Sequence, residues 1–206
     1  MCPRALNRRV GAAGAAVLGA EETVRFLRAV VDEPTHRFQP HIIGQDAATL
    51  AELAQIQRRS PLQLLVILTD QVAAENCLAA EKLAPVLSLF AVADADEGLR
   101  VCHAQLNIDG HGHTAIVHTR STELIQRFAA AMPASRILAN SPGAQGVIGL
   151  TSVLRVSMTL GCGTWGGTST TDNLTYRHLL NIKQIAYYTP HPGSVGCGGV
   201  HDLDEN

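Results

Sequence analysis

Three kinds of side chain in this 206-residue chain could do chemistry. Cys162 stands in the glycine-rich stretch GCGTWGGTSTTDN, where nearby backbone N–H groups can lower the pKa of a thiol. His111, His113 and His118 occur in DGHGHTAIVHT, and Glu81 stands in EKLAP, directly before an apolar run. A thiol, an imidazole and a carboxylate could act as nucleophile, acid/base and hydrogen-bond acceptor.

Each of these residues also has an ordinary structural interpretation. Isolated cysteines are more often packing residues than nucleophiles, so we expect Cys162 to fill a tight loop. A metal site needs three or four ligands, and no third ligand stands at a telling spacing from His111 and His113. We therefore expect no metal site, and one histidine that points into a site as a hydrogen-bond donor or acid/base. Glu81 is either a solvated loop charge or a contact to a ligand.

Alternating strands and helices must position these residues. Apolar runs predict strands at 41–43, 64–68, 86–92, 114–119, 136–140 and 156–160, and helical spacing predicts helices at 21–31, 94–107 and 122–131 and after a cap at Asp46. The run 64–68 is apolar at every residue, as in a strand covered on both faces. The alternation predicts an α/β fold with a mainly parallel sheet and flanking helices.

Two glycine-rich loops follow predicted strands. SPGAQGVIG comes after 136–140, and GCGTWGGTSTTDN comes after 156–160. Parallel α/β sheets bind ligands at the carboxyl ends of their strands, and glycine lets the backbone approach a ligand closely. Both loops are therefore expected at that edge as binding loops. The alternative is two tight surface turns.

The composition excludes several classes of partner. The formal net charge is −2, which gives no electrostatic reason to bind nucleic acid or an anionic membrane surface. Only 17% of the residues are charged, against about 25% in an ordinary soluble domain. A surface this poor in charge is expected to be covered in part by another domain or subunit.

Cysteine usage and hydropathy indicate a cytoplasmic protein. The chain has five cysteines and no C-x-x-C motif, which argues against a disulfide framework or a structural zinc cluster. No apolar run approaches the length of a membrane span. The arginines and the Ala/Gly-rich stretch near the N-terminus also outline an export signal, which we keep as the alternative.

Six segments carry a resemblance to a known family. They are HIIGQDAATLAELAQI, EKLAPVLSLF, GHGHTAIVHT, RILANSPGAQGVIG, TLGCGTWGGTSTTDN and HLLNIK, in collinear order from about Val17 to about Ala186. TLGCGTWGG with HLLNIK behind it is a specific signature. In these segments the chain resembles the CoA-acylating aldehyde dehydrogenases, the branch that includes acetylating acetaldehyde dehydrogenase.

The resemblance implies an activity and a set of site residues. Family members oxidise an aldehyde, acetaldehyde or a similar one, to an acyl-CoA with NAD. A cysteine thiolate forms a thiohemiacetal, hydride leaves to the nicotinamide, and coenzyme A removes the acyl group. The resemblance places Glu81 at the nicotinamide riboside and His113 near the reacting centre. It makes the remaining matched residues part of the substrate and CoA lining: Asn140, Gly143, Gly146, Cys162, Gly163 and Trp165. Cys162 matches a family cysteine that is not the nucleophile.

The chain also departs from the family pattern. Nothing in it matches the family's dinucleotide-binding domain or the C-A-S-E-type segment that holds the nucleophile, and Cys2 does not match it either. We expect a divergent segment at 1–16, a catalytic-domain portion at 17–189 without its first strand, and a disordered tail at 190–206, for which a docking segment is the alternative. The chain alone is then expected to be inactive.

Two other functions stay open. One is a non-catalytic subunit that pairs with a separate cofactor-domain chain or with a family oligomer. The other is ester or thioester hydrolysis by Cys162 with His113. The sequence does not say which aldehyde is used or which oligomer forms.

Overall fold

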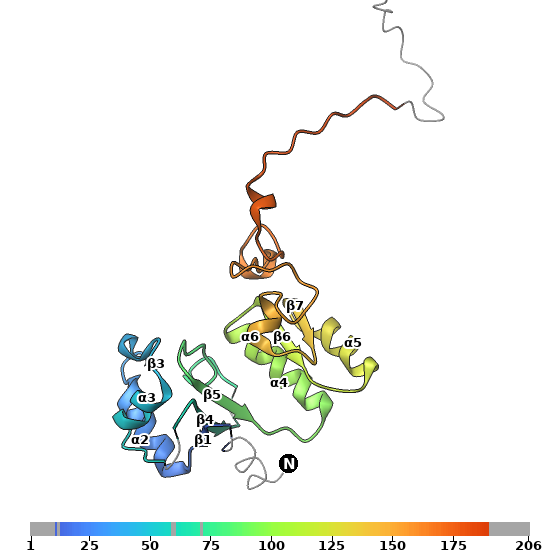
Figure 1. Cartoon of the computed structure of the whole chain (residues 1–206). Coiled ribbons are helices and arrows are strands. Elements are labelled where there is room, and N and C mark those ends of the chain that lie inside the picture. The colour runs from blue at the N-terminus through green and yellow to red at the C-terminus, as the bar shows by residue number, and fades with distance from the viewer. Residues whose placement is uncertain (1–10, 12, 59–60, 71, 190–206) are drawn as a thin grey trace, which may run out of the picture. The chain divides into compact units, whose positions relative to one another are not determined.

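The computed structural model describes residues 11, 13–58, 61–70 and 72–189. Its elements are β1 (Ala15–Val17), α2 (Ala20–Val30), β2 (Val31–Asp32), β3 (Arg37–Phe38), η1 (Pro40–Ile42), α3 (Ala47–Leu53), β4 (Leu64–Thr69), β5 (Val86–Phe90), α4 (Ala95–Ile108), β6 (Gly112–Val117), α5 (Thr122–Ala131), β7 (Ala134–Ala139), α6 (Gly143–Val147), η2 (Thr164–Gly166) and η3 (Tyr176–Leu179) (Figure 1). The contacts divide the described residues into one unit that ends at Thr175 and another that begins at Tyr176.

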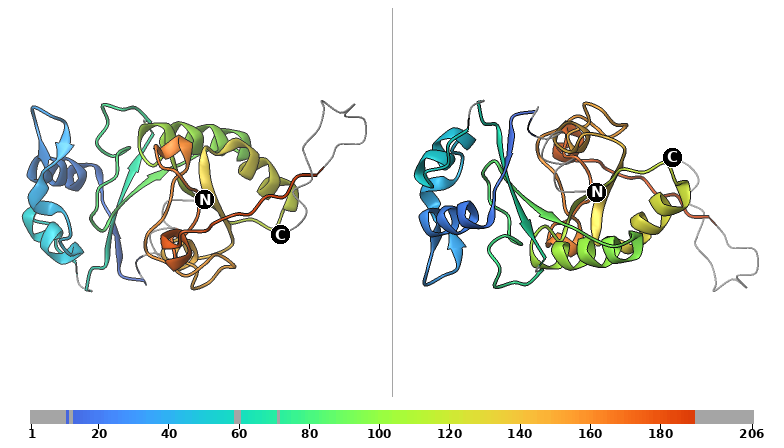
Figure 2. Two further views of the ribbon diagram at one scale, coloured as in Figure 1. Left: turned by 90° about the horizontal axis from the view of Figure 1, so that it is seen from above. Right: turned by 90° about the horizontal axis from the view of Figure 1, so that it is seen from below.

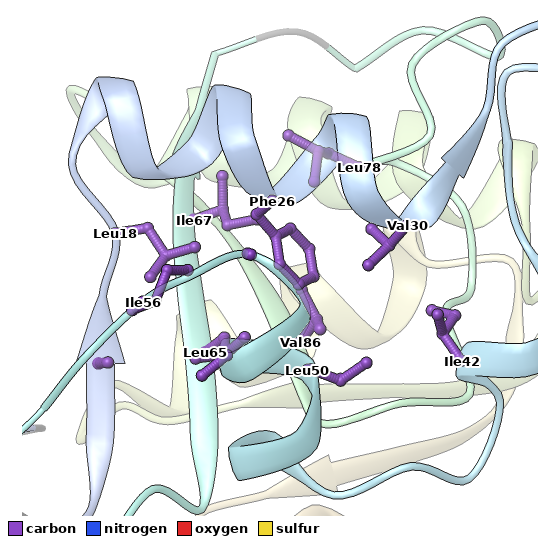
Figure 3. Close-up of a cluster of buried hydrophobic side chains, with 13 residues drawn as sticks. Leu18, Phe26, Val30, Ile42, Leu50, Ile56, Leu65, Ile67, Leu78 and Val86 are labelled. Atoms are coloured by element: carbon purple, nitrogen blue, oxygen red, sulfur yellow. The ribbon is translucent and has the colours of Figure 1, made fainter.

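A three-stranded parallel sheet carries the larger core. Its strand order is β1-β4-β5, so β4 lies in the centre. Leu65 and Ile67 of β4 are fully buried against Phe26 and Val30 of α2, which stand four residues apart on one helix face, and against Leu50 of α3 (Figure 3). Burial of each such side chain contributes about 1.5–3 kcal/mol, so this cluster stabilises the sheet.

A second parallel pair, β6 and β7, positions most of the predicted site. Helices α4 and α5 lie beside this pair (Figure 2). Phe128 of α5 packs with Ala115 of β6 and Ala134 of β7. The two helices begin at side-chain caps: Asp94 accepts from the Glu97 amide, and Ser121 accepts from the Leu124 amide.

The α/β class with parallel pairing is confirmed. The strands predicted at 64–68, 86–92, 114–119 and 136–140 correspond to β4 to β7, and the four predicted helices correspond to α2 to α5. In the described residues, however, the parallel strands form two separate sheets.

The strand predicted at 41–43 is wrong. These residues begin in the 3₁₀ helix η1, where the Ile42 and Ile43 amides donate to Gln39 and Pro40 carbonyls at 3.1 and 3.2 Å. The preceding Pro40 has the fixed φ that suits a first helical position. Only Ile42 of the apolar pair is buried, so the run does not face a sheet.

The strand predicted at 156–160 is also wrong. Among the described residues this segment makes only an isolated bridge between Leu160 and Asn173, and Val156 and Met158 are exposed. Conversely, β1 and the short antiparallel pair β2–β3 had no predicted counterpart. β1 reads AAV, a composition too poor in β-branched side chains to signal a strand, and it forms because it pairs with buried β4.

The predicted terminal segments fall largely outside the described residues. Residues 190–206 and most of 1–16 are not described, so these boundaries stay predictions. Within the described ranges, no helix has both the length and the apolar character needed to cross a membrane.

Candidate functional site

The glycine-rich loop 161–172 packs on the N-terminal ends of β6 and β7. The Ser135 hydroxyl donates to the Cys162 carbonyl at 3.0 Å. Directly before β6, His111 Nδ1 lies 3.1 Å from the Trp165 carbonyl oxygen, and the two rings are tilted by 36° with their centroids 6.3 Å apart. The expected position at the carboxyl edge is therefore wrong for this loop, because 156–160 forms no strand to lead into it.

Two glycines let the loop approach the strands. Gly112 has a φ of +79°, and a Cβ added there would overlap the Cys162 carbonyl oxygen and the Gly166 amide. Gly163 has a φ of +62°, and its amide donates to the Thr170 carbonyl at 2.8 Å. A side chain at Gly112 would lift the loop from the sheet.

Arg136 of β7 hydrogen-bonds to the backbone of loop 161–172. It is 3% exposed and is the only charged residue among the buried described residues. Its Nη1 donates to the Gly161 carbonyl at 2.7 Å and to the Thr171 carbonyl at 3.1 Å, and its Nε donates to Thr114 Oγ1 at 3.3 Å. Its Nη2 lies 3.9 Å from Cys162 Sγ. The sequence interpretation missed Arg136, although a charge inside ASRILA was a visible signal.

His113 lies on β6, beside this guanidinium. Its ring is exposed, and its Nδ1 lies 2.9 Å from Thr114 Oγ1. Partial burial lowers the pKa of His113 below its ordinary value, the positive charge of Arg136 lowers it further, and the negative charge of Glu81 opposes both. The net effect favours the neutral ring. No described hydrogen bond joins it to Cys162, the pairing that ester hydrolysis would need.

Glu81 lies in the loop before β5, with its side chain exposed. Its backbone amide donates to Asp109 Oδ2 at 2.9 Å, whereas its carboxylate has no hydrogen-bond partner among the described residues. The next residue, Lys82, turns inward and donates to the Leu78 and Ala80 carbonyls, each at 2.9 Å. Burial lowers the pKa of the Lys82 amine. The loop thus half-buries the Lys82 side chain and leaves the Glu81 carboxylate available to accept hydrogen bonds near His113.

The other predicted lining residues lie at the opposite ends of the strands. Asn140 follows β7, and its side-chain amide is paired with the backbone N–H and carbonyl of Thr119 at 2.9 and 2.8 Å. Gly146 is buried, with no room for a Cβ against Ser141 and Leu138. Gly143 begins α6 after this turn. A six-residue strand is roughly 20 Å long, so the predicted lining residues form two separate groups.

Two further features bear on binding. Within the described residues, no group of three or more His, Cys, Asp and Glu side chains could hold a metal ion. A cavity of about 330 Å³ is lined by β5, α4, β6 and α5, mostly by apolar side chains, and Thr114 also lines it. None of the predicted site residues lines this cavity.

Comparison with known proteins identifies the relatives. No protein-family model matches the chain. It is 34% identical over 151 residues to aldehyde-alcohol dehydrogenase 2 of Entamoeba histolytica, covering 73% of this chain. It is 30% identical over 175 residues to the acetylating succinate-semialdehyde dehydrogenase of Clostridium kluyveri, covering 85% of this chain. The crystal structure of an acetylating aldehyde dehydrogenase from Geobacillus thermoglucosidasius superposes on 88% of the chain with a TM-score of 0.81 and 31% identity.

The chain spans only part of these proteins. It covers 17% and 38% of the two curated relatives and 40% of the solved structure. The chain is therefore homologous to a part of the CoA-acylating aldehyde dehydrogenases.

Proposed function

We propose that this chain supplies part of the active centre of a CoA-acylating aldehyde dehydrogenase. The reaction converts an aldehyde, coenzyme A and NAD⁺ to an acyl-CoA, NADH and a proton. The observation that carries this proposal is that Cys162 and Trp165 lie at the end of β6 and β7 that also carries His113, near the charge of Glu81. The chain is also 30% and 31% identical to two acetylating aldehyde dehydrogenases.

The exposed Glu81 fits the sugar of a dinucleotide. Its carboxylate has no hydrogen-bond partner in the described part of the chain and can accept bonds from ribose hydroxyls. NAD would supply the acceptor for hydride. Glu81 would orient the nicotinamide end, while the loop at Cys162 and Trp165 would line the substrate and CoA side.

Cys162 fits a supporting role better than that of the nucleophile. Its amide donates to Thr168 Oγ1 at 2.8 Å, its carbonyl accepts from Ser135, and its thiol lies beside the buried Arg136. These contacts use the residue to secure the loop. We therefore assign the attacking thiolate to another cysteine, as the resemblance implies, and expect the 206-residue chain alone to turn over little or no substrate.

Two measurements test this proposal. Trp165 is the only tryptophan, so its fluorescence reports on the loop directly. Coenzyme A should change that fluorescence saturably, and Gly163→Val should abolish the response because φ at Gly163 is +62°. The absence of any saturable change would contradict the assignment of the loop. In an assay with acetaldehyde, coenzyme A and either NAD⁺ or NADP⁺, turnover that persists in both Cys162→Ala and Cys2→Ala would contradict the predicted inactivity.

A second candidate is an interaction subunit that acts with a cofactor-domain chain or a family oligomer in the cytoplasm. Large apolar side chains that are at least 75% exposed favour it: Val153, Met158, Leu179, Ile182, Ile185, Tyr187 and Tyr188. Exposed apolar surface of this extent is typical of a surface that another protein covers. Light scattering after size-exclusion chromatography tests this candidate, since a clean monomer that does not associate would argue against it.

A further inference from the structure

Thr114 connects Arg136 to His113. Thr114 lies directly opposite Arg136 in the register of β6 and β7. Arg136 Nε donates to Thr114 Oγ1 at 3.3 Å, and the same oxygen lies 2.9 Å from His113 Nδ1. One hydroxyl thus contacts both the buried guanidinium and the exposed imidazole.

The direction of each hydrogen bond follows from the groups involved. A guanidinium only donates, so Thr114 Oγ1 must accept from Arg136. The hydroxyl hydrogen then needs an acceptor, and His113 Nδ1 is the one partner of this oxygen in the described residues that can accept. The hydrogen bond from Arg136 polarises the Thr114 hydroxyl, which makes that hydroxyl a better donor to His113.

We propose that Thr114, held by Arg136, is a positioning residue that fixes the His113 ring as the tautomer with its hydrogen on Nε2. The opposite arrangement, with Nδ1–H donating to Oγ1, would leave the Thr114 hydroxyl hydrogen without an acceptor among the described residues. The ring then offers an N–H donor, and not a basic nitrogen, at Nε2.

The surroundings of the ring favour its neutral form, as this tautomer requires. Partial burial lowers the pKa of His113, the positive charge of Arg136 on β7 lowers it further, and the negative charge of Glu81 in the loop before β5 opposes both.

The consequence for catalysis rests on the proposed function. A neutral imidazole with hydrogen on Nε2 can donate to an oxygen on which negative charge develops, such as the carbonyl oxygen of an aldehyde or thioester under attack. It cannot take a proton from coenzyme A through the same nitrogen. His113 would therefore stabilise an oxyanion, and another group would act as the base.

The tautomer can be measured on the 206-residue chain by ¹⁵N NMR of labelled histidine. His113→Asn assigns the signal. In the unsubstituted protein we expect a pyrrole-like Nε2 and a pyridine-like Nδ1. Thr114→Val keeps the shape of the side chain but removes the hydroxyl, and it should shift the tautomer ratio about fivefold toward Nδ1–H, the effect of one net hydrogen bond. Thr114→Ser should restore the original ratio.

The proposal would be overturned by a predominant Nδ1–H tautomer in the unsubstituted protein, or by an identical tautomer ratio in Thr114→Val. Because the tautomer ratio of His113 is measured without turnover, this proposal can fail while the proposed function stands. Conversely, a chain that binds no coenzyme A could still show the tautomer. A ratio that changes equally in Thr114→Val and Thr114→Ser would also contradict it, since that result indicates a packing effect and not a hydroxyl effect.

Discussion

Glycine at position 112 is required by two separate constraints. Its φ is +79°, and an added Cβ would overlap the Cys162 carbonyl. Gly44 has nearly the same φ, +75°, but has open space around its Cβ position. The two glycines therefore form a matched pair. The difference between the free energies of unfolding of Gly112→Ala and Gly44→Ala isolates the contact of residue 112 with loop 161–172.

Gly112→Ala should destabilise the protein more than Gly44→Ala. The left-handed backbone costs both variants about 1–2 kcal/mol. The overlap with Cys162 should cost Gly112→Ala a further 1–3 kcal/mol or so, or displace the loop. Urea denaturation followed by circular dichroism measures the first outcome, and Trp165 fluorescence measures the second. Equal losses with unchanged fluorescence would show that the loop does not pack on Gly112.

A second prediction at this scale concerns the ion pair of Glu22. Arg58 Nη1 and Nη2 contact both carboxylate oxygens at 2.7 and 2.8 Å, and the pKa of Glu22 is lowered from 4.5 to about 2, chiefly by this hydrogen bonding. A lowered folded-state pKa stabilises the protein above about pH 4.5, and this contribution is lost as the pH falls from there through about 2.

Glu22→Gln should lower the free energy of unfolding at pH 7 by about 1 kcal/mol, the value for a well-formed surface pair. Near pH 1, below the lowered pKa of about 2, the variant and the unsubstituted protein should be equally stable, because the carboxyl is then protonated in the folded state too. Glu21→Gln, at an exposed neighbour, is the control and should have little effect at either pH. Urea midpoints across the pH range measure both, and a difference that persists near pH 1 would refute the pairing.

At the scale of elements, one buried arginine anchors a whole loop. The Gly161 and Thr171 carbonyls that accept from Arg136 stand at the two ends of loop 161–172. Burial of a guanidinium is costly unless its N–H groups are paired, and here the loop backbone supplies the acceptors. Loop and strand therefore stabilise each other.

Arg136→Met should release this loop. The buried Gly161 carbonyl would lose its donor at a cost of about 1–3 kcal/mol, and the Thr171 carbonyl would also lose its bond, so the loop should open about tenfold more often. Alkylation of Cys162, read by mass spectrometry of its peptide, should accelerate accordingly. Arg120→Met, at an exposed arginine, serves as the control. An unchanged alkylation rate in Arg136→Met would mean that other contacts hold the loop.

The elements also show what a sequence can predict. Helices α4 and α5 were predictable because their caps, Asp94 and Ser121, and their apolar spacing are local signals. The position of loop 161–172 was not, because it depends on Arg136, which stands 25 residues before Gly161. Likewise, the resemblance named Cys162 and His113, but only the fold shows that Asn140 lies at the other end of the strands.

At the scale of the whole molecule, the described residues combine a well-packed core with much uncovered apolar surface. Phe26, Leu65 and Ile67 are fully buried, whereas Ile185, Tyr187 and Tyr188 are at least 80% exposed. The low charge content of the sequence had indicated such a surface. The relatives extend far beyond the matched segment, so further protein could cover it.

The most direct test of the account is a chimera. In the Geobacillus thermoglucosidasius acetylating enzyme, the matched segment is replaced by residues 17–189 of this chain, and NADH formation from acetaldehyde and coenzyme A is measured. The account predicts turnover that depends on coenzyme A and that falls sharply in the same chimera with His113→Ala. A folded chimera without turnover, or one whose turnover is unaffected by His113→Ala, would contradict it.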